Sequence, residues 1–335
     1  MLNHLNLPPL TDRETMLELL QREEYGYLPP KPDALRWERE VLRKNYCAGK
    51  AVQYEVILTA TIGEKEFSFP MEAVLPTAEG KHPFFVHIGF SPLLFASYQP
   101  TEELVDRGYA VLSFRYIDVT SDDGDFTNGL AGIFYPDGKR GPTDAGKIAL
   151  WAWAAQRVMD YAETLGEVLD LSRATVCGHS RLGKTALFTA ATDERFTCGY
   201  SNDSGCSGAA ISRCKEGETI QKIYDKFPFW FCENYARYKD KEEAQPFDQH
   251  YLIASIAPRR ALVGSAEEDA WADPKNEFLS CVAAAPAFPG EFPHAGRIPR
   301  SGETVFGSHL GYQLRAGTHY FSRHDWNRLI EFLEK

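Results

Sequence analysis

A serine lies in a glycine-flanked turn with the spacing of an activated nucleophile. Ser180 stands in Gly178-His179-Ser180-Arg181-Leu182-Gly183-Lys184, between a short apolar run at 174–178 and a helical pattern at 182–192. A sharp turn from a strand into a helix crowds the backbone, and small residues two before and three after the serine relieve that crowding. Such a turn exposes the hydroxyl at a helix N-terminus, where the dipole favours negative charge. The spacing is GxSxxG rather than GxSxG, and a serine that only caps the helix is the alternative.

A histidine and two acids follow later predicted strands, in the chain order Ser–acid–His of an α/β-hydrolase sheet. His319 comes directly after the last predicted strand and before the closing helix, where a general base belongs. Asp203 ends the strand that follows the helix after Ser180, and Asp269 follows the next strand. Either carboxylate could orient the imidazole and stabilise the imidazolium. For each acid, the alternative is a helix cap or a structural hydrogen bond.

The pattern of the chain predicts a scaffold that brings these distant residues to one edge. Short strands are expected at 82–90, 109–117, 174–178, 198–202, 260–265 and 309–315, and helices at 12–25, 101–107, 144–165, 182–192, 274–284 and 322–334. Strands that alternate with helices predict an α/β fold: a doubly wound, mostly parallel sheet with helices on both faces, or three-layer α/β/α sandwich. Ligands bind such sheets outside the carboxyl ends of the strands.

The remaining segments are assigned from local signals. Two β segments, 52–62 and 66–75, flank Gly63-Glu64-Lys65 as a hairpin. Thr11 is the expected cap of the first helix, with Glu14 three residues later. Residues 217–257 are expected to be mostly helical, and 118–141 and 285–303 to be loops. We expect one catalytic domain over 1–335, with residues 1–50 as a helical and loop lead-in packed on it.

Composition and charge disfavour several classes of function. The 335 residues are 44% hydrophobic and 25% charged, an ordinary globular composition. Thirty-six Lys and Arg against 47 Asp and Glu give a net charge of −11, which disfavours binding to nucleic acid or to an anionic membrane. No apolar run approaches the roughly 20 residues that span a bilayer. The first residues lack the pattern of a signal peptide, so a cytoplasmic location is expected.

No cofactor or metal ion is expected from the motifs. The seven cysteines are an odd number without CxxC spacing, which predicts free thiols and a reducing compartment rather than a zinc site. The dinucleotide, P-loop and HExxH signatures are absent from the sequence. The sequence does not indicate an oligomeric state.

Several ordered motifs resemble one family of esterases. They are Gly178–Lys184, Asn202-Asp203-Ser204-Gly205, Trp230–Asn234, Asp248-Gln249-His250, Asp269–Lys275, and Arg315–His319 followed by Asp325-Trp326. Together they resemble carbohydrate esterase family 15, the glucuronoyl esterases, in its bacterial branch, from about residue 15 to the end. The resemblance implies an α/β-hydrolase fold and a serine esterase that cleaves esters of (4-O-methyl-)glucuronic acid. Its substrate would be a small-molecule or oligosaccharide uronic acid ester.

The resemblance implies a role for each matching residue. Ser180 would be the nucleophile, His319 the general base, and Asp203 the acid that orients it, with Asp269 as a helper or substitute because aspartate has a shorter arm than the family's glutamate. Arg181 would stabilise the oxyanion together with its backbone N–H. The sugar would be held by Lys184, Glu218 and Trp271. Fungal members carry a disulfide-bonded cysteine before the nucleophile, and His179 at this position implies that the bridge is absent.

The binding residues and the function each have an alternative interpretation. Lys184 could be a solvated residue of its helix, Glu218 a first-turn acid, and Trp271 a core residue. Acids surround Trp271 in the sequence, which favours a sugar platform, whereas Trp151, Trp153 and Trp230 lie in apolar helical patterns and are predicted to be core. An acetyl-xylan or other carbohydrate esterase is an alternative function. A non-catalytic carbohydrate-binding protein on the same fold is another.

Overall fold

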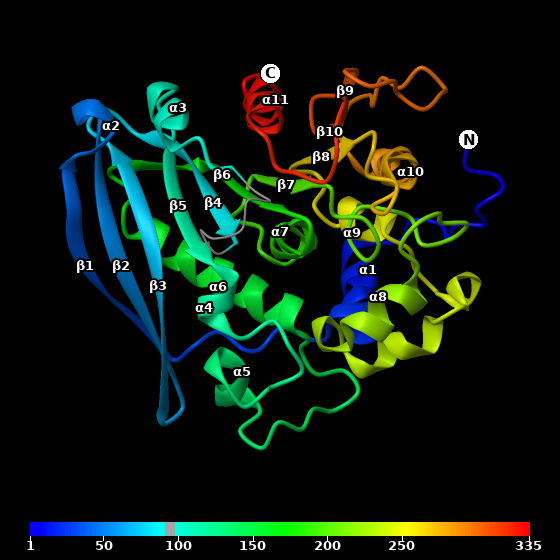
Figure 1. The fold of residues 1–335 in the computed structure, drawn as a ribbon, viewed down its shortest axis with the longest axis horizontal. Coiled ribbons are helices and arrows are strands. Elements are labelled where there is room, and N and C mark those ends of the chain that lie inside the picture. The colour runs from blue at the N-terminus through cyan, green and yellow to red at the C-terminus, as the bar shows by residue number, and fades with distance from the viewer. Residues whose placement is uncertain (91–97) are drawn as a thin grey trace.

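Six parallel strands form the centre of a mixed sheet in the computed structural model, which describes residues 1–90 and 98–335 (Figure 1). The strand order is β1-β2-β3-β5-β4-β6-β7-β8-β10-β9. The first three strands pair antiparallel on one side, and β9 pairs antiparallel with β10 at the other. The strands are β1 Ala34–Asn45, β2 Ala51–Ile62, β3 Lys65–Pro76, β4 His82–Gly89, β5 Ala110–Arg115, β6 Leu169–His179, β7 Cys198–Asn202, β8 Arg260–Ala266, β9 Thr304–Phe306 and β10 Leu310–Arg315.

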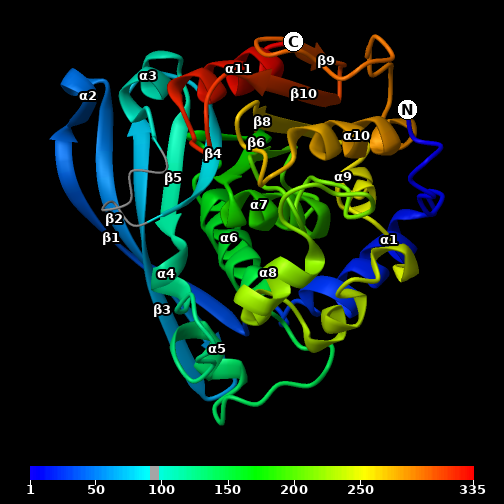
Figure 2. The same ribbon diagram turned by 45° about the vertical axis from the view of Figure 1, so that its right-hand side comes forward.

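Helices cover both faces of this sheet. On one face, α3 and α11 supply Leu104 and Trp326 to an apolar cluster with Phe85 and Leu262 of the strands. On the other, α6 and α7 pack together within the larger core, and Figure 2 shows them below the strands with α11 above. The α-helices are α1 Arg13–Leu20, α2 Tyr46–Gly49, α3 Thr101–Asp106, α4 Tyr116–Val119, α5 Gly129–Phe134, α6 Lys147–Glu163, α7 Arg181–Thr192, α8 Ile220–Lys226, α9 His250–Ala254, α10 Pro274–Ala284 and α11 Arg323–Leu333. The predicted layered α/β architecture is confirmed.

Shorter helical segments complete the chain between these elements. A π-helical turn, η1 Gln21–Tyr25, continues α1, and the 3-10 segments are η2 Pro228–Trp230, η3 Glu233–Tyr238, η4 Glu242–Ala244 and η5 Ala285–Ala287. The helical prediction for 217–257 therefore holds only as short pieces separated by turns. The central strands and long helices agree with the prediction to within three residues, because their apolar runs are buried on both sides or on one stripe. The exception is β6, which begins at Leu169, five residues before the expected start, because residues 170–173 are partly or fully exposed.

The prediction for residues 1–50 is wrong in one respect. Residues 34–45 form the 12-residue edge strand β1, not a helical or loop lead-in. This strand is almost wholly exposed and carries Arg36, Glu38, Arg39 and Glu40, so the apolar alternation that identifies a strand is missing. Its charged side chains suit an edge strand because they discourage pairing with another chain.

Three smaller corrections concern local structure. Asp12, not Thr11, caps α1, because the Asp12 side chain accepts a hydrogen bond from the N–H of Thr15 at 2.9 Å. The expected loop 118–141 contains the end of α4 and all of α5, and the short strand β9 follows the expected loop 285–303. These elements have six residues or fewer, too few to show a clear hydrophobic period.

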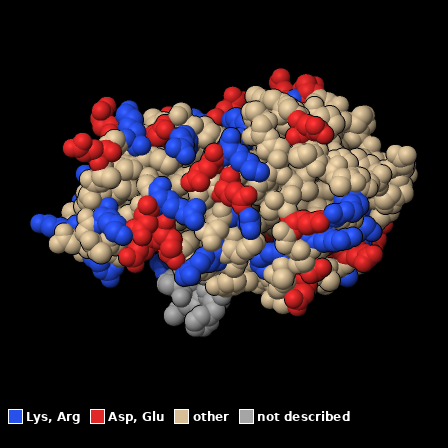
Figure 3. Space-filling model, turned by 90° about the horizontal axis from the view of Figure 1, so that it is seen from above, with Lys and Arg blue, Asp and Glu red and all other residues tan. Residues whose placement is uncertain are grey.

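The surface agrees with the composition. On the face seen from above α3 and α11, basic and acidic side chains are interspersed, without the continuous basic stripe that tracks a nucleic-acid backbone (Figure 3). Among the described residues, none of the helices combines the length and apolar character that crossing a bilayer requires. The seven cysteines all lie in the described part of the chain and are free thiols, as predicted.

A buried histidine lies beneath the carboxyl end of the sheet. His87 on β4 packs edge-on against Trp326 of α11, with ring centroids 5.5 Å apart. Its Nδ1 lies 2.6 Å from Oε1 of Gln99. Burial lowers the pKa of His87 to about 4, against the opposing effect of the hydrogen bond to Gln99. The imidazole is therefore neutral in the folded protein at pH 5, whereas an unfolded histidine is mostly protonated there.

This difference predicts a loss of stability in acid. Between pH 6.5 and about 4, His87 is protonated in the unfolded state but stays neutral in the folded protein. The free energy of unfolding therefore falls as the pH falls through this range. From pH 7 to pH 5 this one group accounts for a loss of about 2 kcal/mol. Urea unfolding of the wild type and of His87→Gln at both pH values measures it. The loss should be smaller by that amount in His87→Gln, and equal losses in the two proteins would contradict the prediction.

Candidate active site

Ser180 lies on a strained turn between β6 and α7. Its backbone has φ 57° and ψ −126°, a left-handed conformation that a residue with a Cβ rarely adopts. The turn is held by a hydrogen bond from the Ser180 N–H to the carbonyl of Asn202 at 2.8 Å. A Cβ on Gly178 would lie 2.2 Å from the carbonyl oxygen of Leu182, and one on Gly183 would lie 2.9 Å from Oγ of Ser201. Backbone contact therefore requires glycine at position 178, and a larger residue at position 183 would crowd the side chains of Ser201 and Ser204, in agreement with the predicted spacing.

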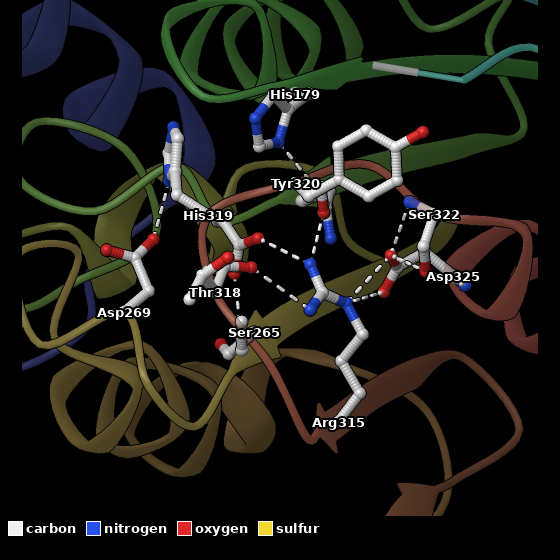
Figure 4. Close-up of polar contacts among 12 residues, drawn as sticks. His179, Ser265, Asp269, Arg315, Thr318, His319, Tyr320, Ser322 and Asp325 are labelled. Carbon is white, nitrogen blue, oxygen red and sulfur yellow. Dashed lines mark hydrogen bonds and ion pairs between the residues drawn. The ribbon is translucent and has the colours of Figure 1, made fainter. Parts of the chain in front are cut away.

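His319 and Asp269 form a hydrogen-bonded pair. The imidazole lies on the turn after β10, and its Nδ1 donates to Oδ2 of Asp269 at 2.6 Å (Figure 4). Asp269 follows β8 and is almost buried. Burial alone would raise its pKa, yet the pKa of Asp269 is lowered, because the hydrogen bond and charge of His319 and the N–H of Ala272 outweigh burial. The carboxylate fixes the tautomer and leaves Nε2 of His319 to accept a proton.

Asp203 does not make the hydrogen bond to His319 that was expected of it. Its carboxylate is buried, where Oδ1 accepts the N–H of Ala266 at 2.7 Å and Oδ2 lies 3.1 Å from Nη2 of Arg315. Burial raises the pKa of Asp203 well above its usual value, aided by the charge of Glu277 and opposed by that of Arg315. Of the two acids that the sequence leaves open, Asp269 is thus the one bonded to the imidazole.

Arg315 fixes the turn that carries His319. Its Nη1 donates to the carbonyls of Ala316 and Thr318, both at 3.1 Å, and its Nη2 donates to the carbonyl of Tyr320. Figure 4 shows the Arg315 side chain between Thr318, Tyr320 and Asp325. Its Nε donates to both oxygens of Asp325 at 2.9 Å. The guanidinium therefore holds the backbone on both sides of His319, and the carboxylate of Asp203 supports the guanidinium. Asp203 contributes to the site through this scaffold.

His179 connects the two halves of the site. Its ring lies against that of His319 with centroids 4.4 Å apart, and its Nδ1 donates to Oδ1 of Asn202 at 2.7 Å. Burial, aided by the charge of His319, lowers the pKa of His179 to about 3, so this ring stays neutral. Because His179 directly precedes Ser180, the packing of the two rings places the imidazole of His319 beside the nucleophile turn. Among the hydrogen bonds of the described residues, none involves the Ser180 hydroxyl, so this oxygen is not tied to another side chain.

Arg181 lies beside the serine among aromatic rings. Its guanidinium carbon is 4.8 Å from the ring centroid of Trp230 and 5.7 Å from those of Phe90 and Phe227. Its Nη1 is paired with Oδ2 of Asp122. Its buried Nε has no hydrogen-bond partner among residues 1–90 and 98–335. The first N–H of α7 also belongs to Arg181 and has no intrahelical partner, so the side chain and the backbone of this residue both offer donors.

The three expected sugar-binding residues come from two adjoining loops and α7. Lys184 is buried, and its Nζ donates to the carbonyls of Cys206, at 2.5 Å, and Ser204. Burial lowers the pKa of Lys184, and the negative charge of Glu218 opposes that shift. The Glu218 N–H donates to the carbonyl of Trp271 at 3.1 Å, which joins the two loops. The Trp271 side chain is 52% exposed, so it is not a core residue.

The cluster around His319 also has the spacing of a metal site. One ligand atom each from Asp203, Asp269 and His319 lies within 4.8 Å of the other two. However, the His319 nitrogen is already bonded to Asp269, and Asp203 is bonded to Arg315 and the backbone. The three side chains are thus already engaged in hydrogen bonds, as in a proton-transfer site, and they do not present a set of free ligand atoms to a metal ion.

Some residues of the site could not be identified from the sequence. Trp151 and Trp153 are fully buried, as predicted, and Trp230 is 4% exposed. Yet Nε1 of Trp230 donates to Oδ1 of Asp122 at 2.7 Å, so this tryptophan borders the site as well as the core. Asp122 lies in the acidic loop after α4, and a lone acid in such a loop gives no signal of its partner.

Comparison with known proteins gives the same family in sequence and structure. A family model described as "Glucuronyl esterase, fungi" matches residues 58–289. A carbohydrate esterase from an unknown prokaryotic organism is 41% identical over 239 residues, covering 70% of this chain and 55% of the relative. A 4-O-methyl-glucuronoyl methylesterase from Podospora anserina is 30% identical over 256 residues, covering 73% and 49%. The chain thus spans about half the length of the curated relatives it matches.

The solved structures agree with this result. A glucuronoyl esterase from Solibacter usitatus is similar with a TM-score of 0.87 and 31% identity, covering 96% of this chain and 91% of the other. A glucuronoyl esterase of carbohydrate esterase family 15 from Teredinibacter turnerae has a TM-score of 0.86 and 28% identity, covering 96% and 83%. The fold expected from the sequence, that of the α/β-hydrolases, is thereby confirmed.

Proposed function

Because this chain belongs to the glucuronoyl esterases, carbohydrate esterase family 15, we propose that it hydrolyses esters of (4-O-methyl-)glucuronic acid through an acyl-enzyme. The observation that carries the proposal is the His319–Asp269 pair, packed through His179 against the strained turn of Ser180. An imidazole with a fixed tautomer beside the turn of a half-buried serine is the arrangement that acyl transfer requires.

In the first half of the reaction, Ser180 attacks the ester carbonyl while Nε2 of His319 takes the proton of the hydroxyl. The imidazolium that forms is stabilised by Asp269, whose pKa is already lowered in the free enzyme. His319 then returns the proton to the leaving alcohol as the tetrahedral intermediate collapses to the acyl-enzyme. In the second half, His319 activates water in the same way and Ser180 leaves.

Arg181 is the proposed stabiliser of the oxyanion. Negative charge develops on the carbonyl oxygen in both halves of the reaction, beside the first N–H of α7 and the guanidinium. A pre-organised donor at this position contributes about 3–4 kcal/mol to transition-state stabilisation. The surrounding aromatic rings shield part of the guanidinium from water, which strengthens that interaction.

The sugar is proposed to lie between α7 and the two joined loops. The Lys184 ammonium donates two of its three N–H groups to backbone carbonyls, which leaves one N–H for a hydroxyl of the sugar. The carboxylate of Glu218 accepts no hydrogen bond from a described residue, so it is available to a hydroxyl donor. The exposed face of Trp271 suits the apolar face of a pyranose ring. These groups would discriminate a uronate from a plain acetate.

A comparison of two ester classes tests this proposal. We expect the purified protein to hydrolyse benzyl glucuronate with a higher kcat/KM than 4-nitrophenyl acetate, and to leave acetylated xylan essentially intact. Trp271→Ala should lower kcat/KM for the glucuronate ester about tenfold, within the range of one lost apolar contact, and leave the acetate rate unchanged. Trp37→Ala is the matched control, because Trp37 is 42% exposed on β1.

The outcomes separate the competing functions. Hydrolysis of acetylated xylan with benzyl glucuronate left intact would favour an acetyl-xylan esterase and contradict the proposal. Absence of all ester hydrolysis, with no labelling of Ser180 by a fluorophosphonate, would favour a non-catalytic carbohydrate-binding protein.

A further inference from the structure

A single carboxylate receives three donors next to the nucleophile. Asp122 accepts the indole N–H of Trp230 at 2.7 Å on Oδ1, and the hydroxyl of Tyr116 at 3.0 Å on Oδ2. Its Oδ2 is also paired with Nη1 of Arg181. The side chain of Asp122 is 13% exposed and that of Arg181 26%, so the pair lies largely out of solvent. A carboxylate bonded to three different elements is held rigidly.

The partners of Asp122 are themselves fixed. Trp230 stacks parallel on Phe227, with centroids 3.9 Å apart and an interplanar angle of 2°. The ring of Tyr116 packs edge-on against Trp151 in the core at 4.8 Å. Burial raises the pKa of Tyr116 to about 12, aided by the charge of Asp122, so its hydroxyl remains a donor. Asp122 is therefore anchored to the core on one side and to the aromatic wall of the site on the other.

From this geometry we infer that Asp122 is a positioning residue that pre-orients the Arg181 guanidinium for the oxyanion. An arginine side chain has several rotatable bonds, and ordering it on binding costs rotamer freedom. Pairing at Nη1 and stacking on Trp230 remove that freedom before substrate binds, and they leave Nε unbonded among the described residues. This inference rests on the proposed function, because it assigns Arg181 to the oxyanion.

Two opposing effects of Asp122 can be told apart by experiment. If orientation dominates, loss of the carboxylate frees Arg181 to rotate and lowers kcat. If neutralisation dominates, loss of the carboxylate releases the full positive charge and raises kcat. Because the substrate ground state gains little from an oxyanion donor, the expected effect lies in kcat and leaves KM nearly unchanged.

The test is a double-mutant cycle of Asp122→Asn and Arg181→Ala, measured with benzyl glucuronate and 4-nitrophenyl acetate. We expect Asp122→Asn to lower kcat 10- to 100-fold with KM within about twofold. In the Arg181→Ala background the same change should have less than a twofold effect, because Asp122 acts through Arg181. Asp123→Asn, the same substitution at the next, exposed position of the loop, is the control and should leave kcat within twofold.

Three results would overturn the inference. They are a raised or unchanged kcat in Asp122→Asn, an effect on KM alone, and equal losses in the presence and absence of Arg181. If Asp122→Asn does not fold, Trp230→Phe is measured instead. This variant keeps a ring that can stack on Phe227 but removes the indole N–H that anchors Asp122, and an unchanged kcat would overturn the inference.

The wild-type rates separate this result from the proposed function. If only the acetate is hydrolysed, the proposed substrate fails while the cycle still tests Asp122. If neither ester is hydrolysed, both fail.

Discussion

Ser180→Ala is expected to lower kcat for benzyl glucuronate by at least about 10⁴-fold. The reason is that alanine has no oxygen to form the acyl-enzyme, so only the binding groups and the oxyanion donors remain to act on water. Steady-state kinetics measure the loss, and a fluorophosphonate should label the wild type at Ser180 with one equivalent. The control is Ser172→Ala, an exposed serine of β6, the strand that leads to Ser180, and this variant should keep full activity.

The backbone at this position provides a second readout of the same prediction. The left-handed conformation at Ser180 stores about 1–3 kcal/mol of strain, and glycine relieves it at a cost of about 0.5–1 kcal/mol in backbone entropy. Ser180→Gly should therefore be as inactive as Ser180→Ala, but its free energy of unfolding should be about 1 kcal/mol higher than that of Ser180→Ala. An alanine variant that retains a tenth of wild-type turnover, or a label on another serine, would contradict the assignment of the nucleophile.

Local steric rules explain why the nucleophile turn could be predicted from the sequence. Gly178 leaves room for the backbone of the turn, where no larger residue fits, and Gly183 leaves room for the side chains of Ser201 and Ser204. Hydrophobic periodicity, which is also a local signal, predicts the apolar strands. The order of Ser180 and His319 along the chain matches the order in an α/β-hydrolase sheet. The edge strand β1 lacks such a signal, because its exposed residues are mostly charged.

The residues that could not be predicted depend on long-range contacts. Asp203 and Asp269 both follow strand ends, and only the path of the turn 316–320, fixed by Arg315, decides which carboxylate meets His319. Asp122 precedes Arg181 by 59 residues and lies in a loop without periodicity. Trp230 has the apolar surroundings of a core residue, but its indole N–H reaches the site. In each case the sequence supplies the residue type and the tertiary packing supplies the partner.

Asp269→Asn is expected to reduce kcat about 10³- to 10⁴-fold, the second large effect. Asparagine can present an N–H to Nδ1 of His319, which favours the wrong tautomer and removes the charge that stabilises the imidazolium. The contact is at 2.6 Å and the side chain of Asp269 is almost buried, so water cannot replace the lost carboxylate. Steady-state kinetics measure the effect, and the labelling rate of Ser180 by a fluorophosphonate should fall in parallel.

Asp203→Asn is the matched variant, because it makes the same substitution at the acid that the family resemblance implies. Its carboxylate contacts Arg315 and the N–H of Ala266, so an amide placed against the guanidinium leaves a buried donor facing another donor. We expect a loss of about 1–3 kcal/mol in the free energy of unfolding, with kcat lowered by less than about tenfold.

The two variants together separate orientation of the base from support of its turn. Orientation by Asp269 predicts a large loss of kcat in Asp269→Asn and only a small loss in Asp203→Asn, whatever each substitution does to stability. The reverse pattern, with kcat abolished only in Asp203→Asn, would contradict the assignment and would require the turn 316–320 to move His319 toward Asp203 during turnover. Because Arg315 donates to three carbonyls of that turn, such a movement would have to break hydrogen bonds that hold His319 in place. The fixed turn is therefore the physical reason to expect Asp269, and not Asp203, to orient the base.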